Sequence, residues 1–349
     1  MNSFPVAIAA NNGDIGGGEV MLLNIARAVR EIGLEPLVLG PAAPAELVAA
    51  ARDRGFSVQE LEARDRRSYM ASLRRWRRAH PRFPLWCNGL VPSFATAGMG
   101  PRLVHLHIAP HGAHRIAAEA GRFGARRVLV PSRDMARRIR GSVVLANWTE
   151  SLAVRDRPRR KNSLRVGFLG RLTRDKGVHI LADAIARLRD TGFDATLVLA
   201  GENRFGSAED DAVIGSSLAR LGPAVEDLGW TDRRSFFDAV DLAVFPSVWA
   251  EPFGLVVAEA MAVGCPFVIS DAGALPEVAG ADHPWIARAG DPEHLAQVIS
   301  EAADVLDHSE PQLQRARSRW EREFSPQAGT ARVRALLRTL DTPDNRGEA

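Results

Sequence analysis

The chain has 349 residues, of which 46% are hydrophobic and 25% are charged, and its formal net charge is +3. One hydrophobic core does not normally serve so many residues, so we expect two domains of roughly 150 residues each. A charge so close to balance gives no reason to expect nucleic acid as a partner. The two widely separated cysteines, Cys87 and Cys265, argue against a disulfide framework and for a reducing, cytoplasmic setting.

The N-terminal segment has the pattern of a parallel α/β sheet. Residues 5–10 predict a short buried strand and lack the basic and long apolar segments of a signal peptide. A glycine-rich loop, an amphipathic helix from Val20 to about Gly33 and a strand at residues 37–39 follow. The loop contains Gly16-Gly17-Gly18-Glu19 but lacks G-x-G-x-x-G spacing. Its backbone N–H groups could bind an anion, or the glycines could simply allow a tight turn.

Residues 64–78 are strongly basic and follow a predicted helix at residues 45–54. Met70, Leu73 and Trp76 have the spacing of an inward-facing helical stripe, which favours an ordinary helix with its arginines in solvent. The alternative is a weak peripheral contact between this helix and the anionic inner face of a membrane. No window of the sequence has the length and apolarity of a membrane span.

Four histidines lie in or just after a predicted strand at residues 103–108. His105 and His107 share one face of that strand, and His111 and His114 follow it. No cysteine or carboxylate joins them at the spacing of metal ligands, so we predict no metal site. His107, at the carboxyl end of the strand, is better placed to face a ligand.

The clearest linker is residues 155–163, a polar and basic segment broken by Pro158. It follows predicted strands at residues 128–132 and 143–147 and precedes a second α/β pattern. The predicted organisation is a first domain at residues 1–154, the linker, a second domain at residues 164–325, a terminal helix at residues 326–341 and a polar tail at residues 342–349.

Two cations stand in the first loop of the second domain. Arg171 follows the predicted strand at Leu164–Leu169, and Lys176 lies at the start of the next helix. Cations at a helix N-terminus suit a diphosphate, although solvated loop cations would look the same. The chain contains only one other lysine, Lys161, which modestly favours a function for Lys176.

The segment from Glu251 to Gly264 contains two carboxylates eight residues apart. Glu251 lies in a turn beside Pro252, and Glu259 lies in a predicted helix, Leu255–Val263, that is otherwise apolar all round. Such a helix is usually buried, and a lone buried carboxylate is costly unless it is paired or hydrogen-bonded. Either an arginine in the core or a polar ligand therefore satisfies Glu259.

In open parallel sheets, ligands bind at the carboxyl ends of the strands, where these loops would lie. At this point the chain resembles glycosyltransferase family 4, which comprises retaining nucleotide-sugar enzymes of the GT-B fold. The motifs that carry the resemblance are Gly170-Arg171-Leu172, Lys176-Gly177, Pro246-Ser247, Glu251-Pro252-Phe253-Gly254, Glu259, Gly264-Cys265-Pro266, Ser270-Asp271-Ala272-Gly273 and Pro276-Glu277, with Gly16-Gly17-Gly18-Glu19 and Pro131-Ser132 as weaker N-terminal matches. The implied fold is α/β, with two Rossmann-like domains facing a central cleft and a C-terminal helix that crosses back to the N-terminal domain.

The resemblance also implies roles for side chains of the donor domain. Glu259 would accept the ribose hydroxyls of the nucleotide, and Glu251 would hold hydroxyls of the donor sugar. Arg171 and Lys176 would bind the diphosphate and stabilise its charge as it leaves.

Further donor contacts are implied for backbone groups and for the N-terminal domain. N–H groups near Phe253, Gly254 and Leu255 would assist from the helix N-terminus, and His107 would contact the donor sugar. The implied donor-binding glycines are Gly17, Gly18 and Gly170.

The implied reaction is transfer of a hexose from a nucleotide diphosphate to an acceptor hydroxyl in carbohydrate biosynthesis. The acceptor would attack on the face that the diphosphate leaves, and a phosphate oxygen would take its proton. The sequence contains no Asp-x-Asp, so no metal or other cofactor is expected. Ile108 and Trp148 depart from the family pattern and leave the acceptor open among a glycan, a lipid-linked sugar and a small molecule. The alternatives are a sugar-nucleotide epimerase and a catalytically idle nucleotide-sugar-binding protein.

Overall fold

The structure is a computed structural model that describes residues 5–153, 163–202 and 207–341. It divides into two compact units. The N unit comprises the chain up to Trp148 together with the chain from Pro326 onward, and the C unit is Thr149–Ser325. The predicted linker, apart from Ser163, and the predicted tail lie outside the described residues.

The N unit is built on a seven-stranded parallel sheet with the order β3-β2-β1-β4-β5-β6-β7. Its strands are β1 (Val6–Ala9), β2 (Pro36–Pro41), β3 (Ser57–Leu61), β4 (Leu85–Asn88), β5 (Arg102–His105), β6 (Arg127–Val130) and β7 (Val143–Val144). Its helices are α1 (Gly17–Glu31), α2 (Glu46–Asp53), α3 (Arg66–Ala79), α4 (Leu90–Ala95), α5 (Ala113–Arg122), α6 (Arg133–Arg138) and α14 (Pro326–Asp341).

The C unit repeats this plan around a six-stranded parallel sheet with the order β10-β9-β8-β11-β12-β13. Its strands are β8 (Leu164–Leu169), β9 (Ala195–Ala200), β10 (Val225–Asp227), β11 (Leu242–Phe245), β12 (Phe267–Ser270) and β13 (Ile286–Ala287). Its helices are α7 (Val178–Asp190), α8 (Ala208–Ala219), α9 (Arg233–Ala239), α10 (Leu255–Val263), α11 (Leu275–Ala279), α12 (Pro292–Asp304) and α13 (Glu310–Glu323), with 3₁₀ turns η1 (Arg174–Lys176), η2 (Gly222–Ala224) and η3 (Leu306–His308).

Both sheets are doubly wound, as the alternation of strands and helices in the sequence predicts. In each sheet the direction of winding reverses next to the first strand, between β1 and β4 in the N unit and between β8 and β11 in the C unit. Central strands such as β1 and β11 are fully buried, because helices cover both faces of a parallel sheet. The carboxyl ends at the reversal form the switch point, where open α/β sheets bind ligands.

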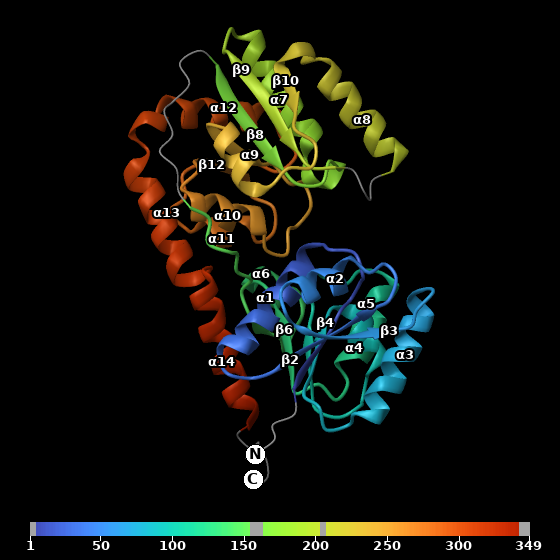
Figure 1. The fold of residues 1–349 in the computed structure, drawn as a ribbon. Helices are drawn as coiled ribbons and strands as arrows, with labels where there is room; N and C mark the ends of the chain where they lie inside the picture. Colours follow the sequence, from blue (N-terminus) through green and yellow to red (C-terminus); the bar gives the residue numbers. More distant parts are fainter. Residues whose placement is uncertain (1–4, 154–162, 203–206, 342–349) are drawn as a thin grey trace. The chain divides into compact units, whose positions relative to one another are not determined.

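The last helix belongs to the N unit, where α14 packs along α1 (Figure 1). The ring of buried Trp148 lies where a side chain at Gly329 would stand, 2.2 Å from the Cβ position. Thr330 donates a hydrogen bond of 2.7 Å to Glu31, and Arg332 donates one of 3.1 Å to the carbonyl of Ala146. Trp148, which departs from the family pattern, is therefore a packing residue beneath α14.

Several predicted boundaries were wrong. Helix α1 begins at Gly17 and not after Glu19, because Glu19 reaches back to accept the N–H of Gly16 and caps the helix. Strand β5 ends at His105 and β7 at Val144, both earlier than predicted. Helices α4, α5, α6, α8, α9 and α11 were not predicted. The acidic segment of α8 shows little apolar periodicity, whereas α5 is amphipathic and its pattern was overlooked.

The basic segment at residues 64–78 contains one arginine that the prediction misplaced. Arg77 is buried, and its guanidinium donates to the carbonyls of His80, Phe83, Met99 and Pro101. A buried guanidinium is tolerated when its donors are satisfied, so this residue ties α3 to the loop before β5. No helix in the described part of the chain combines the length and the apolarity needed to cross a membrane.

Candidate active site

The switch point of the C unit joins Lys176 to Glu251. Lys176 ends the turn η1 after β8, and its Nζ lies 2.5 Å from Oε1 of Glu251, which follows β11. The hydroxyl of Ser247 donates to the same carboxylate oxygen at 2.6 Å, and Ser247 is held in turn by Ser270, which donates to its carbonyl. The glutamate is buried and the lysine is mostly buried, so this pair is shielded from bulk water. Because an ammonium has three donors, Lys176 can keep Glu251 and still bind an anion.

Close backbone contacts hold the two loops in this position. Gly177 has a φ of 75°, and a Cβ there would lie 2.0 Å from the carbonyl oxygen of Pro246. The carbonyl of Asp175 accepts the N–H of Val248 at 2.9 Å. These contacts leave no room for a side chain at Gly177, which explains the glycine directly after the lysine.

Glu251 is fixed on its other side by the loop after β12. The N–H of Ala274 donates to the carbonyl of Glu251 at 2.9 Å. Gly273, with a φ of 60°, would place a Cβ 2.4 Å from the backbone nitrogen of Glu251. Three strand ends therefore position this one carboxylate.

Arg171 lies beside this pair and is more exposed. Its guanidinium is 3.3 Å from the carboxylate of Asp175, whose other oxygen accepts a hydrogen bond from Thr173. The preceding Gly170 has a φ of 153°, and its carbonyl lies 1.9 Å from the Cβ position of Gly201 after β9. The two cations predicted to bind a diphosphate are thus on one loop, and each already has a carboxylate partner.

Helix α10 carries Glu259 into the core, as predicted. Its carboxylate is buried, its Oε1 accepts a hydrogen bond from Nε of Arg233, and its Oε2 has no partner among the described residues. Burial raises the pKa of Glu259 and Arg233 opposes that rise. The sequence left open whether an arginine or a polar ligand satisfies Glu259. Arg233 pairs with one carboxylate oxygen, and the other oxygen stays available for a hydrogen-bond donor of a ligand.

The N-terminus of α10 is formed by the other residues of the motif. Gly254 is the N-cap, with a φ of 91°, and Leu255 begins the helix. The ring of Phe253 is buried and meets Phe324 edge to face at 5.4 Å. This packing fixes the direction in which the first N–H groups of the helix point, and those groups have no partner within the helix.

In the N unit, a hydrogen-bonded chain joins the predicted glycines to His107. The amide of Asn88, at the end of β4, donates to the carbonyl of Gly18 at 2.8 Å. The other atom of that amide, Oδ1, lies 2.8 Å from Nε2 of His107. Gly18 faces the histidine ring, which would lie 3.4 Å from a Cβ at that position, and Gly17 begins α1.

His107 is held neutral, and the neighbouring His105 shares its environment. Burial lowers the pKa of His107 to about 4, and the rings of the two histidines are 4.1 Å apart. His105 is fully buried, and neither of its ring nitrogens has a partner among the described residues. Across the described ranges, no three His, Cys, Asp or Glu side chains are grouped to hold a metal ion.

Three residues that hydrogen-bond to the candidate residues were not predicted to do so. Arg233 opens α9 shortly after β10, at the carboxyl edge of the sheet, so its position was a usable signal. Ser247 and Asn88 were noted only as parts of their loops. The hydrogen bond between Asn88 and His107 joins two strand ends and is not visible in local sequence, whereas that between Ser247 and Glu251 lies within one loop.

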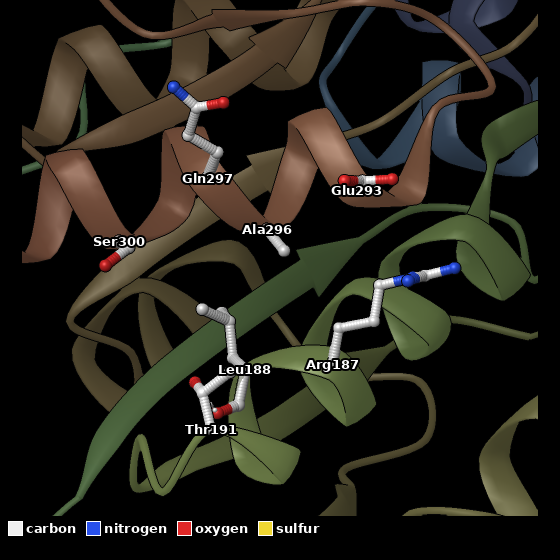
Figure 2. A pocket seen from close by; sticks show the side chains of 7 residues that line it. All are labelled: Arg187, Leu188, Thr191, Glu293, Ala296, Gln297 and Ser300. Atoms are coloured by element: carbon white, nitrogen blue, oxygen red, sulfur yellow. Dashed lines mark hydrogen bonds between the residues drawn. The ribbon is translucent and has the colours of Figure 1, made fainter.

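A small surface pocket of the C unit lies elsewhere. Figure 2 shows it between α7 and α12, where Leu188 and Ala296 approach each other from the two helices. Its lining residues are Arg187, Leu188, Thr191, Glu293, Ala296, Gln297 and Ser300. None of the candidate residues belongs to this lining, so the pocket is separate from the switch point.

In comparisons with known proteins, the match to a family model lies in the C unit. Residues 163–304, which include Arg171, Lys176, Glu251 and Glu259, match the family model for glycosyl transferases group 1. Glycogen synthase of Mycobacterium tuberculosis is 34% identical over 183 residues, which are 52% of this chain and 42% of the relative. The 2-deoxystreptamine glucosyltransferase of Streptomyces kanamyceticus is 30% identical over 165 residues, which are 44% and 39% of the two chains.

These matches span less than half the length of the curated relatives. The fold match extends much further. The crystal structure of HepE from Anabaena in complex with UDP-glucose superposes with a TM-score of 0.82 at 20% sequence identity, covering 97% of this chain and 100% of that chain. The two doubly wound sheets of this chain therefore have the GT-B glycosyltransferase fold, and its C unit is similar in sequence to glycosyl transferases of group 1.

Proposed function

We propose that this protein is a retaining, metal-independent glycosyltransferase that moves a hexose from a nucleotide diphosphate to an acceptor hydroxyl. The observation that carries the proposal is the shielded pair of Lys176 and Glu251 at the switch point of the C unit. A diphosphate needs cations, and a sugar needs a fixed hydrogen-bond acceptor beside them. The described hydrogen bonds to the Glu251 carboxylate reach only its Oε1, which leaves Oε2 for a sugar hydroxyl.

The nucleotide would be recognised by α10. Its Glu259 has a buried oxygen without a described partner, which suits a ribose hydroxyl. Backbone N–H groups of Phe253, Gly254 and Leu255, at the N-terminus of this helix, favour the phosphate charge. UDP is the nucleotide to test first, because the structural neighbour HepE was crystallised with UDP-glucose.

In the proposed reaction, the bond between the anomeric carbon and the diphosphate oxygen breaks, and its electron pair stays on the diphosphate. Lys176 and Arg171 stabilise that developing charge in place of a metal ion. The acceptor hydroxyl attacks from the same face and passes its proton to a phosphate oxygen. The neutral His107 donates or accepts a hydrogen bond with the donor sugar, and Gly17, Gly18 and Gly170 allow close approach of the backbone. This chemistry suits the cytoplasm, where nucleotide sugars and free thiols such as Cys87 coexist.

The test is release of UDP from UDP-glucose in long incubations with EDTA present. We expect slow hydrolysis by the wild-type chain and none by Lys176→Ala, with the sugar first released as the anomer present in the donor, as seen by NMR. Formation of an epimerised nucleotide sugar would contradict the proposal. So would binding of the donor with no hydrolysis or transfer under any condition.

A further inference from the structure

We propose that the N unit docks on an anionic phospholipid surface through a patch formed by the C-terminal turns of α3 and the exposed apolar side chains of α4 and α5. The patch comprises Arg74, Arg75, Arg78, Arg82, Phe94, Ile116 and Phe123. The inference goes beyond the proposed function, because it concerns a surface that contains none of the donor residues.

The arginines of the patch occupy the outer face of α3. Arg74, Arg75 and Arg78 are exposed, and Arg82 follows the helix and is exposed as well. Positions three and four residues apart share one face of a helix, so the first three form a single cationic surface. In the described ranges none of the four belongs to an ion pair, in contrast to exposed arginines elsewhere, such as Arg52 with Glu60.

The apolar part of the patch lies on α4 and α5. Ile116 is 77% exposed and Phe123 is 73% exposed, and the two stand seven residues apart, which is two helical turns. Phe94 on α4 is 43% exposed. Single exposed apolar side chains are ordinary, but three on the packed helices α4 and α5 are typical of a surface that meets an apolar phase.

Specific contacts bring the two parts together. Buried Arg77 donates to the carbonyls of Met99 and Pro101, which ties the last turns of α3 to the loop before β5. In the same loop, the N–H of Gly98 donates to the carbonyl of Phe123 at 2.9 Å, and the ring of Phe123 lies 3.2 Å from the Cβ position of Gly98. The end of α3 and the end of α5 therefore flank one loop.

This combination favours a membrane over other polyanions. Cations alone would serve any polyanion, whereas side chains such as Ile116 gain free energy only by entering an apolar phase. Helices in a parallel sheet run opposite to the strands, so Arg78 and Phe123, at the ends of α3 and α5, lie toward the edge of the sheet away from the switch point. Ile116 lies about two turns before Phe123, in the first turn of α5.

The test is cosedimentation of the full chain with vesicles of phosphatidylcholine containing 30% phosphatidylserine, against vesicles of phosphatidylcholine alone. We expect binding to the anionic vesicles at low salt. The triple variant Arg74→Gln, Arg75→Gln, Arg78→Gln should bind roughly 100-fold more weakly, since each arginine near an anionic surface contributes on the order of fivefold. Wild type should keep part of its vesicle binding at high salt, because apolar insertion is not screened. The double variant that combines Ile116→Ser with Phe123→Ser should lose that residual binding, and its vesicle affinity at low salt should fall about tenfold.

The matched control is Arg187→Gln, Arg322→Gln, Arg334→Gln, which removes the same charge from exposed positions outside the patch. It should weaken vesicle binding by less than about threefold. Circular dichroism and thermal unfolding will verify that every variant is folded. Equal losses in the two triple variants would overturn the proposal, as would absence of binding at low salt. Tighter binding to a single-stranded oligonucleotide than to vesicles, lost in the patch variant, would also overturn it.

Discussion

At the switch point of the C unit, a lysine and a glutamate lie shielded from water, whereas at the carboxyl edge of the N unit an asparagine that ends β4 is hydrogen-bonded to a histidine that follows β5. The sheets have the same strand order apart from the additional β7 of the N unit, and each set of loops is fixed by hydrogen bonds between strand ends. One site holds charge in a low-dielectric setting, and the other has excluded it, as the low pKa of His107 indicates.

This difference assigns different tasks to two similar frameworks. A site with fixed charges can offset the charge of a diphosphate without reorganising. A neutral site can offer hydrogen bonds to sugar hydroxyls without binding free phosphate. We therefore expect substitutions at the C-unit site to reduce donor binding and turnover far more than substitutions at the N-unit site.

The largest effect is expected for Lys176→Ala. It removes the buried cation and leaves Glu251 without its ion-pair partner, so turnover of UDP-glucose should fall by about 10³-fold. The matched control is Arg174→Ala in the same 3₁₀ turn, whose side chain is exposed and pairs with Glu209. Turnover by the control should stay within about threefold of wild type, and equal losses would show that the turn, and not the ammonium, matters.

A pair of glycine substitutions compares the two sites sterically. Gly273→Ala would push a methyl group to 2.4 Å from the backbone nitrogen of Glu251, at a φ of 60°, so we expect turnover to fall more than 100-fold with a loss of stability of about 2–4 kcal/mol. Gly18→Ala would place its methyl group 3.4 Å from the His107 ring, an ordinary contact, and should cost less than tenfold. Turnover assays and thermal unfolding measure the two variants. A larger loss of turnover in Gly18→Ala than in Gly273→Ala would refute the greater importance of the C-unit site.

Glu259→Gln tests the nucleotide contact. The substitution keeps the shape and the hydrogen bond to Arg233 but weakens the acceptor, so the Kd for UDP should rise about 10- to 100-fold by calorimetry. Glu209→Gln, at an exposed pair, is the control and should leave the Kd unchanged. Unaltered UDP binding by Glu259→Gln would mean that this carboxylate serves only Arg233.

The last prediction concerns the pH dependence of stability and lies in the N unit. Burial raises the pKa of Glu19, beside the glycine-rich loop, from 4.5 to about 7. Between these pH values the folded state keeps a proton that the unfolded chain releases, so stability should fall as pH rises from about 4.5 to about 7, by on the order of 3 kcal/mol. Glu19→Gln should flatten this slope in thermal unfolding measured at pH 5, 6 and 7.5. A slope as steep as that of wild type would show that other groups cause it.

The sequence was sufficient for the two sheets and for the positions of the candidate residues within them. Lys176, Glu251 and Glu259 could be predicted because each stands in a local pattern, a strand followed by a turn or an apolar helix interrupted by one charge. Their partners could not be predicted, because pairing depends on distant loops that meet only in the folded sheet. The bond between Arg233 and Glu259 joins two helices, and that between Asn88 and His107 joins two strand ends.

Buried polar side chains were the main failure of the sequence analysis. Arg77 stands in a run of basic residues and was assigned to solvent with the rest. It is buried because four backbone carbonyls happen to converge around it, and a single sequence carries no signal for that. Arg102, in β5, is buried in the same way, with its guanidinium bound to the carbonyls of Ser93 and Phe123.

The most direct test of a donor site in the C unit is calorimetric titration of UDP into three forms of the full chain. These are the wild type, a double variant that combines Lys176→Ala with Glu259→Gln, and the single variant His107→Ala. We predict that UDP binds to wild type and to His107→Ala with similar affinity and that binding to the double variant falls below detection. Loss of UDP binding in His107→Ala together with its retention in the double variant would contradict the assignment of the donor to the C unit.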